Sequence, residues 1–481
     1  MTYLDKLIGA LSRDTGRVVL VDADSGTSVS ASELTARIAR LAQALRTTGI
    51  GAGSLVALVA PNTVDALAVR YAAGLLGCPT VYCPYQFDPD RLTAFLGAVD
   101  ADLIIVFPET AAAVGAEPTT RTVSVGSVPG IAEDLLAGMD SEALPLPSAP
   151  VLPAELCALV ASGGTTGVSK ASRRDWQTYA AMVDSGAAPD RRQLVCTPLA
   201  YIAQMMADMA LIAGGTVVLL RRFEPRRVLQ AMQEYRVTHV TLVEPQLVAL
   251  TDCDVLGTTD LSAVRAISHV GADCAPGLRI RLLERLGRPI LVNTYGASEI
   301  GLVSVLAAPD YHLDHPELLA SAGRPLAGIE VRIVDTDDND CGPEELGSIL
   351  VRSGAMAQGY SGSPTSSGFR VNGWFDTGDM GSLDAGGYLT IRGRRGDMRI
   401  IDGQRVFPKD IQDSVCLSPD VRYAVAVPDP AGAGFGVVVV PRPGAHPTGL
   451  PEPAVLVETV PMTEQGKPHR QAIVDLVWPA R

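Results

Sequence analysis

Residues 161–170 combine three glycines, four hydroxyl side chains and a lysine, directly after an apolar run. Glycines let backbone N–H groups approach an anion, hydroxyls add donors and a lysine adds positive charge, so this composition suits a phosphate-binding loop. An ordinary flexible turn has the same composition. A Walker A loop is excluded, because Val168 and Ser169 separate Gly167 from the lysine. The candidate phosphate-binding residues are Ser162, Gly163, Gly164, Thr165, Thr166, Gly167 and Lys170.

A second cluster lies at residues 293–301, on a predicted glycine-punctuated turn after a strand expected at 290–292. The ring of Tyr295 can stack on a base, the hydroxyl of Ser298 can contact phosphate, and the carboxylate of Glu299 can hold Mg²⁺ against phosphate oxygens. A capped turn before a helix explains the same residues without a ligand.

Three further clusters follow along the chain. Residues 374–379 place Asp379 at a predicted tight turn, where its carboxylate can accept hydrogen bonds from ribose hydroxyls. Thr-Gly-Asp turns are common, so this cluster says little alone. Residues 393–397 and 461–470 add an Arg-Arg-Gly-Asp stretch and a Gly-Lys pair. The order of all five clusters is more informative than any one of them.

Strands and helices must bring these clusters together, and the sequence predicts an α/β arrangement. Runs of β-branched residues such as 17–21 and 54–59 alternate with Ala/Leu-rich helical patterns such as 31–46. The apolar run 156–160 predicts a strand that leads into the glycine loop. A strand, a helix and a strand are expected again at residues 215–220, 224–235 and 237–243, which favours a parallel sheet.

The predicted helix at 31–46 shows how the core is expected to form. Ser30 is its expected N-cap, and its apolar residues at helical spacing are Leu34, Ile38, Leu41 and Leu45. Further on, the acidic turn at 335–340 and the strand-forming residues after 347 predict a β-rich subdomain. The Val-rich strands after Arg394 predict a small separate domain.

Composition narrows the classes of partner. The 481 residues predict two or three domains, and the net charge of −14 argues against binding to nucleic acid or to an anionic membrane. The eight cysteines contain no C-x-x-C pair, so zinc-site spacing is absent. Neither a signal peptide nor an apolar run of about 18 residues is visible. We therefore expect a cytoplasmic protein without a membrane span.

The five clusters in this order resemble the AMP-forming adenylate superfamily, which includes acyl- and aryl-CoA ligases, the adenylation domains of peptide synthetases, and luciferase. Residues 45–51, 60–62 and 270–273 also look like landmarks of that family. The resemblance implies a large AMP-binding domain at residues 1–396, built from α/β sheet subdomains plus a β-rich one. A small, mobile, shortened α+β domain at 397–481 would carry the catalytic lysine.

The resemblance also implies the chemistry. A small acyl or aryl carboxylate attacks the α-phosphate of ATP, and a thiol of CoA or of carrier-protein phosphopantetheine then displaces AMP. Thr165 and Thr166 would contact phosphate, Ser298 would approach the α-phosphate, and Glu299 with Thr165 would hold Mg²⁺. The adenine and ribose would be bound by Gly271, Ala272, Asp273, Tyr295, Gly296, Asp379 and Arg394.

Two residues near the C-terminus have implied roles in catalysis. Lys467 matches the family's lysine that reaches the α-phosphate and the attacking carboxylate, and we expect it to act with Ser298 and Glu299. Asp397 matches the hinge at which the small domain rotates. A solvated aspartate in a charged turn is the alternative for Asp397, and an ordinary surface charge is the alternative for Arg394.

The sequence departs from the family at three places. Ser169 replaces a usual proline, which adds a donor to the loop. Tyr201 replaces a usual histidine near the substrate carboxyl, in a predicted pocket with Thr294 and Ala297; a plain core aromatic is the alternative. The helix that normally precedes the final lysine strand is missing from the sequence. We therefore hypothesise that adenylation is retained, while the acceptor stays open between CoA and another nucleophile.

Two further interpretations stay open. An adenylate-forming enzyme with this shortened domain would pass the activated group to an amine, or would adenylate a small oxyanion such as nitrite. A catalytically inactive nucleotide-binding protein is the alternative from another class, and the retention of Glu299, Asp379, Arg394 and Lys467 together argues against it. ATP and a small acid are the expected ligands of a monomer or homodimer, with a carrier protein as a candidate partner.

Overall fold

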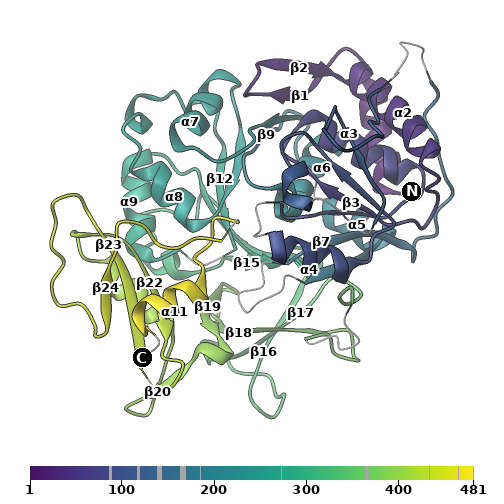
Figure 1. The fold of residues 1–481 in the computed structure, drawn as a ribbon. Coiled ribbons are helices and arrows are strands. Elements are labelled where there is room, and N and C mark those ends of the chain that lie inside the picture. The colour runs from purple at the N-terminus through teal and green to yellow at the C-terminus, as the bar shows by residue number, and fades with distance from the viewer. Residues whose placement is uncertain are drawn as a thin grey trace. The chain divides into compact units, whose positions relative to one another are not determined.

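The computed structural model describes residues 1–85, 89–115, 120–137, 144–162, 170–184, 186–271, 274–362, 368–432, 434–463 and 465–479. The chain forms two compact units, whose elements are labelled in Figure 1. Unit 1 comprises Met1–Thr241, Asp260–Val264 and Gly354–Ser366, and unit 2 comprises Leu242–Thr259, Arg265–Ser353 and Ser367–Arg481. The predicted boundary between residues 396 and 397 stays a prediction.

Unit 1 contains two sheets that are largely parallel. One has the order β6-β5-β3-β4-β7-β8, in which the pairings from β6 to β7 are parallel and only β8 runs antiparallel to β7. Its strands are β3 (Val56–Val59), β4 (Thr80–Tyr82), β5 (Leu103–Val106), β6 (Thr122–Ser124), β7 (Leu156–Ala161) and β8 (Ala171–Asp175). The other sheet runs β11-β9-β10-β1-β2 within this unit. These strands are β1 (Val18–Asp22), β2 (Thr27–Ser30), β9 (Arg192–Val195), β10 (Thr216–Leu219) and β11 (His239–Leu242).

The helices of unit 1 alternate with these strands, as the sequence predicts. They are α1 (Tyr3–Arg13), α2 (Ala31–Thr47), α3 (Val64–Leu75), α4 (Pro89–Val99), α5 (Trp176–Val183), α6 (Gln204–Ile212) and α7 (Pro225–Glu234), with short helical turns η1 (Ala111–Val114) and η2 (Leu199–Ala203). In α2, Ser30 caps the N-terminus in a capping box with Glu33. The four predicted core residues of this helix are fully buried, so the helix-periodic pattern is confirmed.

A closed polar cluster lies in the core of unit 1. The guanidinium of Arg70 on α3 donates two hydrogen bonds, of 2.8 and 2.9 Å, to the carboxylate of Asp208 on α6. The same carboxylate accepts from the hydroxyls of Tyr71 at 2.7 Å and Tyr179 at 2.6 Å. Arg70 and Asp208 are 0% and 1% exposed. This pair is therefore sealed from solvent.

Unit 2 is richer in antiparallel strands. Strands β12 (Ala266–Val270), β13 (Leu291–Ala297), β14 (Gly301–Leu306) and β15 (Arg324–Pro325) are neighbours in that order. A four-stranded antiparallel sheet follows, made of β16 (Glu330–Val334), β17 (Gly347–Arg352), β18 (Phe375–Leu383) and β19 (Leu389–Arg394). The β-rich region predicted after residue 347 corresponds to this sheet. The helices of this part are α8 (Glu244–Thr251) and α9 (Pro276–Leu286), with turns η3 (Leu256–Thr258), η4 (Pro316–Ala320) and η5 (Arg395–Asp397).

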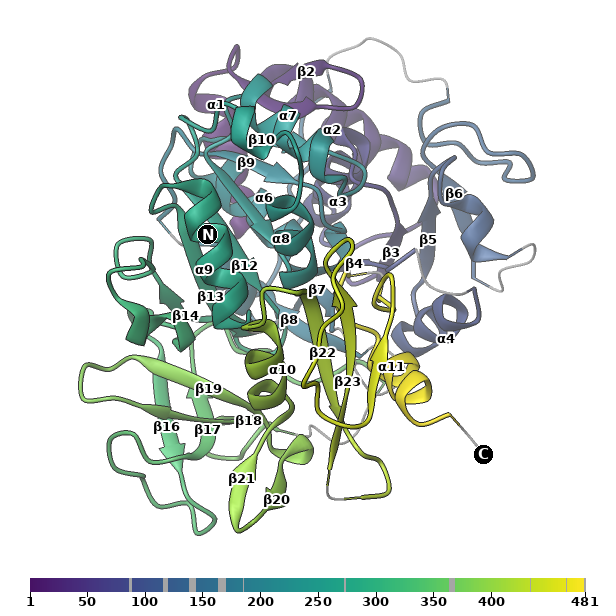
Figure 2. The same cartoon turned by 90° about the vertical axis from the view of Figure 1, so that its left-hand side faces the viewer.

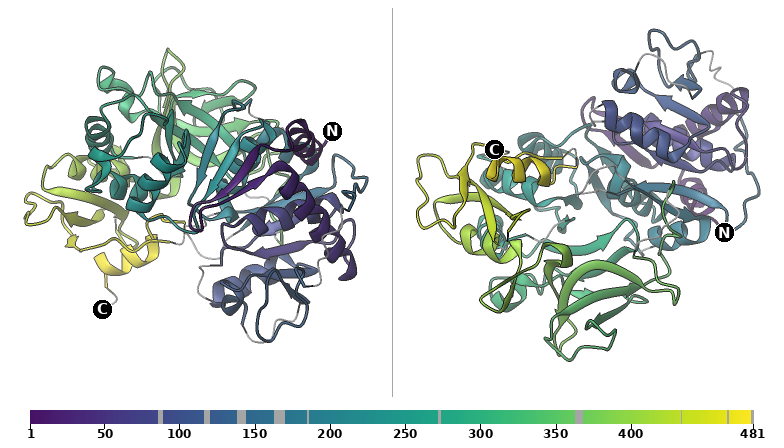
Figure 3. Two further views of the ribbon diagram at one scale, coloured as in Figure 1. Left: turned by 90° about the horizontal axis from the view of Figure 1, so that it is seen from above. Right: turned by 60° about the horizontal axis from the view of Figure 1, so that its bottom comes forward.

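The C-terminal part of unit 2 has the predicted α+β content. Its elements are β20 (Arg399–Ile401), β21 (Gln404–Val406), α10 (Pro408–Cys416), β22 (Val421–Pro428), β23 (Phe435–Pro441), β24 (Ala454–Leu456) and α11 (Arg470–Val477). Figure 2 shows α10 next to α9, and Figure 3 shows the C-terminal helix against the last strands. Between β23 and α11 the described residues form β24 but no helix, in agreement with the shortened domain seen in the sequence.

The chain is thus a mixed α/β protein with a small α+β segment at its C-terminus, as expected. Among the residues with described positions, no helix has the length and apolar character needed to cross a bilayer.

Candidate active site

The cluster at residues 293–301 lies in a β-hairpin: strand β13 occupies much of the predicted glycine-punctuated turn, and strand β14 follows instead of the helix of the alternative interpretation. Strand β13 pairs with β12 as far as Thr294 and continues to Ala297 because it pairs with β14 on the other side. Only residues 298–300 form the turn. Gly296 is required by close packing, since a Cβ there would lie 2.3 Å from the carbonyl oxygen of Gly301. Tyr295 and Ser298 are thereby held on a paired strand and on its turn.

Asp379 also lies within a strand, which corrects the tight turn predicted for residues 374–379. On β17, Ser348 pairs with Met380 and Leu350 pairs with Asp376, so the residues between them on β18 form a bulge. Gly378 has a φ of +72°, which favours glycine. The hydroxyl of Thr377 donates to the carbonyl of Ile349 at 3.0 Å and accepts from the N–H of Asp379 at 3.1 Å. The bulge therefore fixes the direction of the Asp379 side chain.

The structure brings Tyr295, Asp379 and Arg394 together. The Tyr295 hydroxyl donates to one carboxylate oxygen of Asp379 at 2.7 Å, and the Arg394 Nε lies 2.9 Å from the other. A second nitrogen of Arg394 donates to the Thr377 carbonyl at 2.8 Å. The Asp379 side chain is 11% exposed, whereas that of Arg394 is 61% exposed. The carboxylate is therefore preorganised while the guanidinium remains open to a ligand.

Burial shifts the titration of this group of residues. Desolvation raises the pKa of Asp379, and the neighbouring Arg394 charge and the Tyr295 hydrogen bond act against that rise. Desolvation and the Asp379 charge together raise the pKa of Tyr295 well above its usual range, so the phenol is a donor at neutral pH. These protonation states suit a site that binds hydroxyl groups of a sugar and the face of a base.

Lys467 lies on a tight turn whose backbone is held by Thr463. The Lys467 N–H donates to the Thr463 hydroxyl at 3.2 Å, and the Thr463 N–H donates to the Lys467 carbonyl at 2.6 Å. The end of the lysine side chain lies over Gly271, just after β12: a Cβ on Gly271 would be 2.6 Å from Cε and 2.7 Å from Nζ. Gly271 is thus required by its φ of +86° and by the lysine.

The ammonium of Lys467 is electrostatically coupled to two other predicted residues. Desolvation and the Arg394 charge lower its pKa to about 8, and Glu299 acts in the opposite direction. Below that pH the lysine carries its charge, which can neutralise a phosphate. Ser298 donates to Glu299 at 3.1 Å, so the last two predicted polar groups of the hairpin turn are adjacent.

The predicted hinge residue, Asp397, has a specific partner. Its two carboxylate oxygens form a bidentate ion pair with Arg470, the first residue of α11. Arg470 follows Lys467 by three positions. The 3₁₀ turn that holds Asp397 is therefore tied to the segment that carries the lysine. The hinge role itself stays a prediction.

Of the remaining described site residues, Thr294 and Ala297 lie on β13, and the others lie in unit 1. Ser162 directly follows β7, and its N–H donates to the Lys170 carbonyl at 2.7 Å. The Lys170 ammonium lies 4.9 Å from the ring centre of Tyr360, a cation–π contact. Tyr201 is half-buried on η2 and packs on the apolar cluster of the sheet that contains β7. Predicted residues outside the described part of the chain are Gly163, Gly164, Thr165, Thr166, Gly167, Ala272 and Asp273.

Sequence reasoning missed two residues that hold the site in place, Glu244 and Arg470. Glu244 is 2% exposed and is the first residue of α8. Acidic residues are favourable near the N-terminus of any helix, so its type does not single it out. The only signal in the sequence is a Glu-Pro pair between a strand and a helix. Arg470 follows the Gly-Lys motif, but its partner lies 73 residues earlier, which spacing alone does not indicate.

The donor set of unit 2 fits a magnesium ion bound mainly by phosphate. Mg²⁺ in nucleotide sites is usually held by one or two carboxylates plus substrate phosphates and water. Glu299 supplies one carboxylate that can act as a metal ligand, beside the Ser298 hydroxyl. Within the described ranges, no group of three or more His, Cys, Asp or Glu side chains forms a closed metal cage. A single-carboxylate site is consistent with both observations.

Comparison with known proteins agrees with this geometry. The sequence model of the family described as AMP-binding enzyme matches residues 10–361. A medium/long-chain fatty-acid–CoA ligase of Mycobacterium tuberculosis is 30% identical, over 98% of this chain and 89% of that protein. A feruloyl-CoA synthase of an Amycolatopsis species is 31% identical, over 88% of this chain and 86% of that protein.

A solved structure of similar overall fold is the amide bond synthetase McbA from Marinactinospora thermotolerans. It has a TM-score of 0.87 and 28% sequence identity, and the match covers 98% of each chain. The match of the family model to most of the chain, together with these relatives, shows the family. The chain belongs to the AMP-binding enzyme family and is an AMP-forming ligase.

Proposed function

We propose that this ligase activates a small carboxylic acid with ATP and transfers the acyl group to a thiol, either CoA or a carrier-protein phosphopantetheine. A carboxylate oxygen attacks the α-phosphorus, the bond to pyrophosphate breaks, and an acyl-adenylate forms. The thiol sulfur then attacks the acyl carbon, and AMP leaves. The relatives that are named as CoA ligases support the thiol acceptor.

The observation that carries the proposal is the position of the Lys467 side chain over Gly271, in the unit that also holds Glu299 and Arg394, whose charges act on the lysine. A carboxylate and a polyphosphate repel each other, so the reaction needs positive charge where negative charge develops. Lys467 provides that charge at a strand end, at the tip of a C-terminal turn. The partly buried ammonium acts more strongly there than it would in water.

The other residues have supporting roles in this proposal. Asp379 accepts hydrogen bonds from ribose hydroxyls, which replace the hydrogen bond from Tyr295. The charge of Arg394 favours the ionised form of this carboxylate. The Tyr295 ring lies along the adenine. Ser298 contacts the α-phosphate and Glu299 holds Mg²⁺, which would neutralise phosphate charge when bound. Thr294, Ala297 and Tyr201 are assigned to binding of the acid, and Thr165 and Thr166 to contact with phosphate.

A second acceptor is favoured by one observation. The likeness to an amide bond synthetase extends over nearly the whole chain, and the described residues between β23 and α11 contain no helix. An amine would attack the same acyl carbon and release AMP. This alternative keeps every residue role in the adenylation step.

Pyrophosphate release tests the proposal. We expect ATP-dependent release with one member of a panel of straight-chain and aromatic acids, and no release without an acid. Adding CoA should then give a thioester and AMP. Amide formation with added amines, and no thioester with CoA, would move the assignment to the second acceptor. An absence of pyrophosphate release and of ATP binding under all conditions would contradict the proposal.

A further inference from the structure

The turn that carries Lys467 rests on the start of α8. A Cβ on Gly466 would lie 3.3 Å from Cγ2 of Val243 and 3.4 Å from Nε2 of Gln246. Gln246 is itself held, because its side-chain oxygen accepts from the N–H of Val243 at 3.1 Å. The position of Lys467 over Gly271 therefore depends on how the C-terminal segment sits on this helix end.

One buried carboxylate joins that helix end to the C-terminal segment. Glu244 lies between Val243 and Gln246 in sequence, and one of its oxygens accepts from the Tyr423 hydroxyl on β22 at 2.9 Å. The other oxygen accepts from the Ala275 N–H at 3.2 Å and from the Gln412 side chain on α10 at 3.3 Å. A single side chain of α8 thus contacts the start of α9, α10 and β22.

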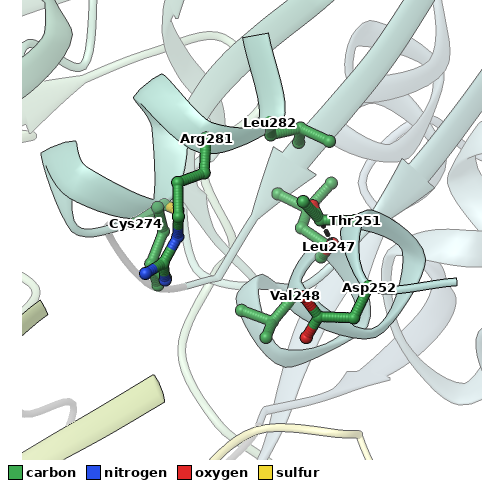
Figure 4. A pocket seen from close by; sticks show the side chains of 8 residues that line it. Leu247, Val248, Thr251, Asp252, Cys274, Arg281 and Leu282 are labelled. Atoms are coloured by element: carbon green, nitrogen blue, oxygen red, sulfur yellow. Dashed lines mark hydrogen bonds between the residues drawn. The ribbon is translucent and has the colours of Figure 1, made fainter. Parts of the chain in front are cut away.

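The buried contacts around it are apolar or involve backbone groups, and at the partly exposed far end of α8 Arg422 on β22 forms an ion pair with Asp252 at 2.6 Å. Val248, Cys274 and Leu278 belong to the same buried cluster as Val415 and Val421. Arg281 on α9 donates to the carbonyls of residues 421 and 422, at 2.8 Å each. Helices α8 and α9 also line a pocket of about 10 Å³, room for about one water molecule (Figure 4). This pocket is too small for a substrate.

Apolar packing favours burial but does not define one orientation, because the hydrophobic effect is non-directional. Hydrogen bonds to a carboxylate are directional. A buried carboxylate is also costly to desolvate, and apolar residues of the same volume often stabilise a protein as well or better. A glutamate at this position is therefore better explained by the orientation it defines than by added stability.

We propose that Glu244 and Tyr423 are positioning residues for adenylation, and that their hydrogen bond fixes the C-terminal segment on α8 so that Lys467 lies over Gly271. The inference rests on the proposed catalytic role of Lys467. Neither residue touches the reacting atoms. Loss of the contact lets the lysine leave its desolvated position beside Arg394 and Glu299.

The test is Tyr423→Phe, which removes one hydroxyl and keeps the ring. The first readout needs no substrate: trace acetylation of the full-length protein with acetic anhydride across pH, followed by mass spectrometry of the Lys467 peptide. In the wild type, half-maximal reactivity is expected near the lysine pKa of about 8. In Tyr423→Phe the midpoint should move toward the ordinary lysine value of about 10.4.

The matched control is Tyr388→Phe, which also removes a tyrosine hydroxyl that donates to a carboxylate, that of Asp310 at 3.0 Å. It should leave the midpoint for Lys467 unchanged. The second readout is pyrophosphate release with the acid that gives the fastest release in the panel above. Tyr423→Phe should lower kcat about tenfold and leave KM for ATP within about twofold.

Unchanged labelling and an unchanged kcat in folded Tyr423→Phe would overturn the proposal. Circular dichroism and a melting curve establish that the variant is folded. Should it not fold, Gln412→Leu removes another hydrogen bond to the same carboxylate from the partly exposed α10 and gives the same comparison. A shifted midpoint together with wild-type release in Lys467→Ala would contradict the catalytic role of the lysine while leaving the positioning contact intact.

Discussion

The two units each contain an aspartate that binds an arginine and accepts a hydrogen bond from tyrosine, but the two groups differ in their access to solvent. In unit 1, Asp208 accepts hydrogen bonds from Arg70 and from two tyrosine hydroxyls, and both charged side chains are buried in the core. In unit 2, Asp379 accepts a hydrogen bond from Tyr295 and forms an ion pair with Arg394, and the arginine is largely exposed. The same residue types therefore build a structural core in one place and a ligand-ready site in the other.

Breaking the closed pair should have the largest effect on stability. Arg70→Met leaves the Asp208 charge buried without its ion-pair partner, and the loss of one partner from a buried pair typically costs about 3–5 kcal/mol. Chemical denaturation of the variant should show a loss of that order in the free energy of unfolding. The double variant Arg70→Met/Asp208→Leu should recover part of it. An unchanged denaturation midpoint in the single variant would remove the structural half of the comparison.

Breaking the open group should affect nucleotide binding more than stability. Asp379→Asn keeps the shape but removes the charged acceptor, and a hydrogen bond to a charged group is worth about 1.5–3 kcal/mol. Calorimetric titration with ATP should therefore show binding about 10–100-fold weaker. The melting temperature should stay close to that of the wild type, because burial already disfavours the charged form of Asp379. Wild-type affinity would contradict the assignment of Asp379 to the ribose.

The pH dependence of adenylation tests the charge state of Lys467. Because the pKa of Lys467 is lowered to about 8, its charge is present below that pH and is lost as the pH rises through it. The value of kcat/KM for adenylation, which reports the free enzyme, should fall about tenfold per pH unit above the pKa. Lys467→Arg should be slower at pH 7 but should lack this alkaline decline. The same decline in both proteins would assign it to another group.

The smallest effect on stability and on ATP binding is expected at an exposed ion pair that belongs to neither group. Arg352 on β17 contacts Glu330 on β16 at 2.5 Å and packs on the Trp374 ring, with both charged side chains largely in solvent. Exposed ion pairs contribute little. Arg352→Gln should leave ATP affinity and pyrophosphate release unchanged and should alter the melting temperature less than Arg70→Met does. A loss of ATP binding would show that exposure alone does not separate structural from functional pairs.

Periodicity and spacing predicted the alternating helices and strands of unit 1, because these depend on local patterns such as the buried face of α2 and its Ser30 cap. The surroundings of Tyr295 and Asp379 could not be predicted in the same way. Strand β13 extends through a motif that reads as a turn, since pairing with β12 and β14 overrides local preference. The Glu244–Tyr423 contact joins residues 179 positions apart, and such a distance has no signal in one sequence. The adenylate chemistry was visible only from the order of five clusters and their resemblance to a family.

In the proposed reaction, Lys467 supplies the positive charge for adenylation. The most direct measurement is the single-turnover rate of acyl-adenylate formation in Lys467→Ala, with Lys409→Ala on α10 as the control for loss of a lysine from the same segment. We predict a fall of about 100- to 1,000-fold for Lys467→Ala, with ATP still bound, and a wild-type rate for the control. A wild-type rate of adenylate formation in folded Lys467→Ala would contradict the account.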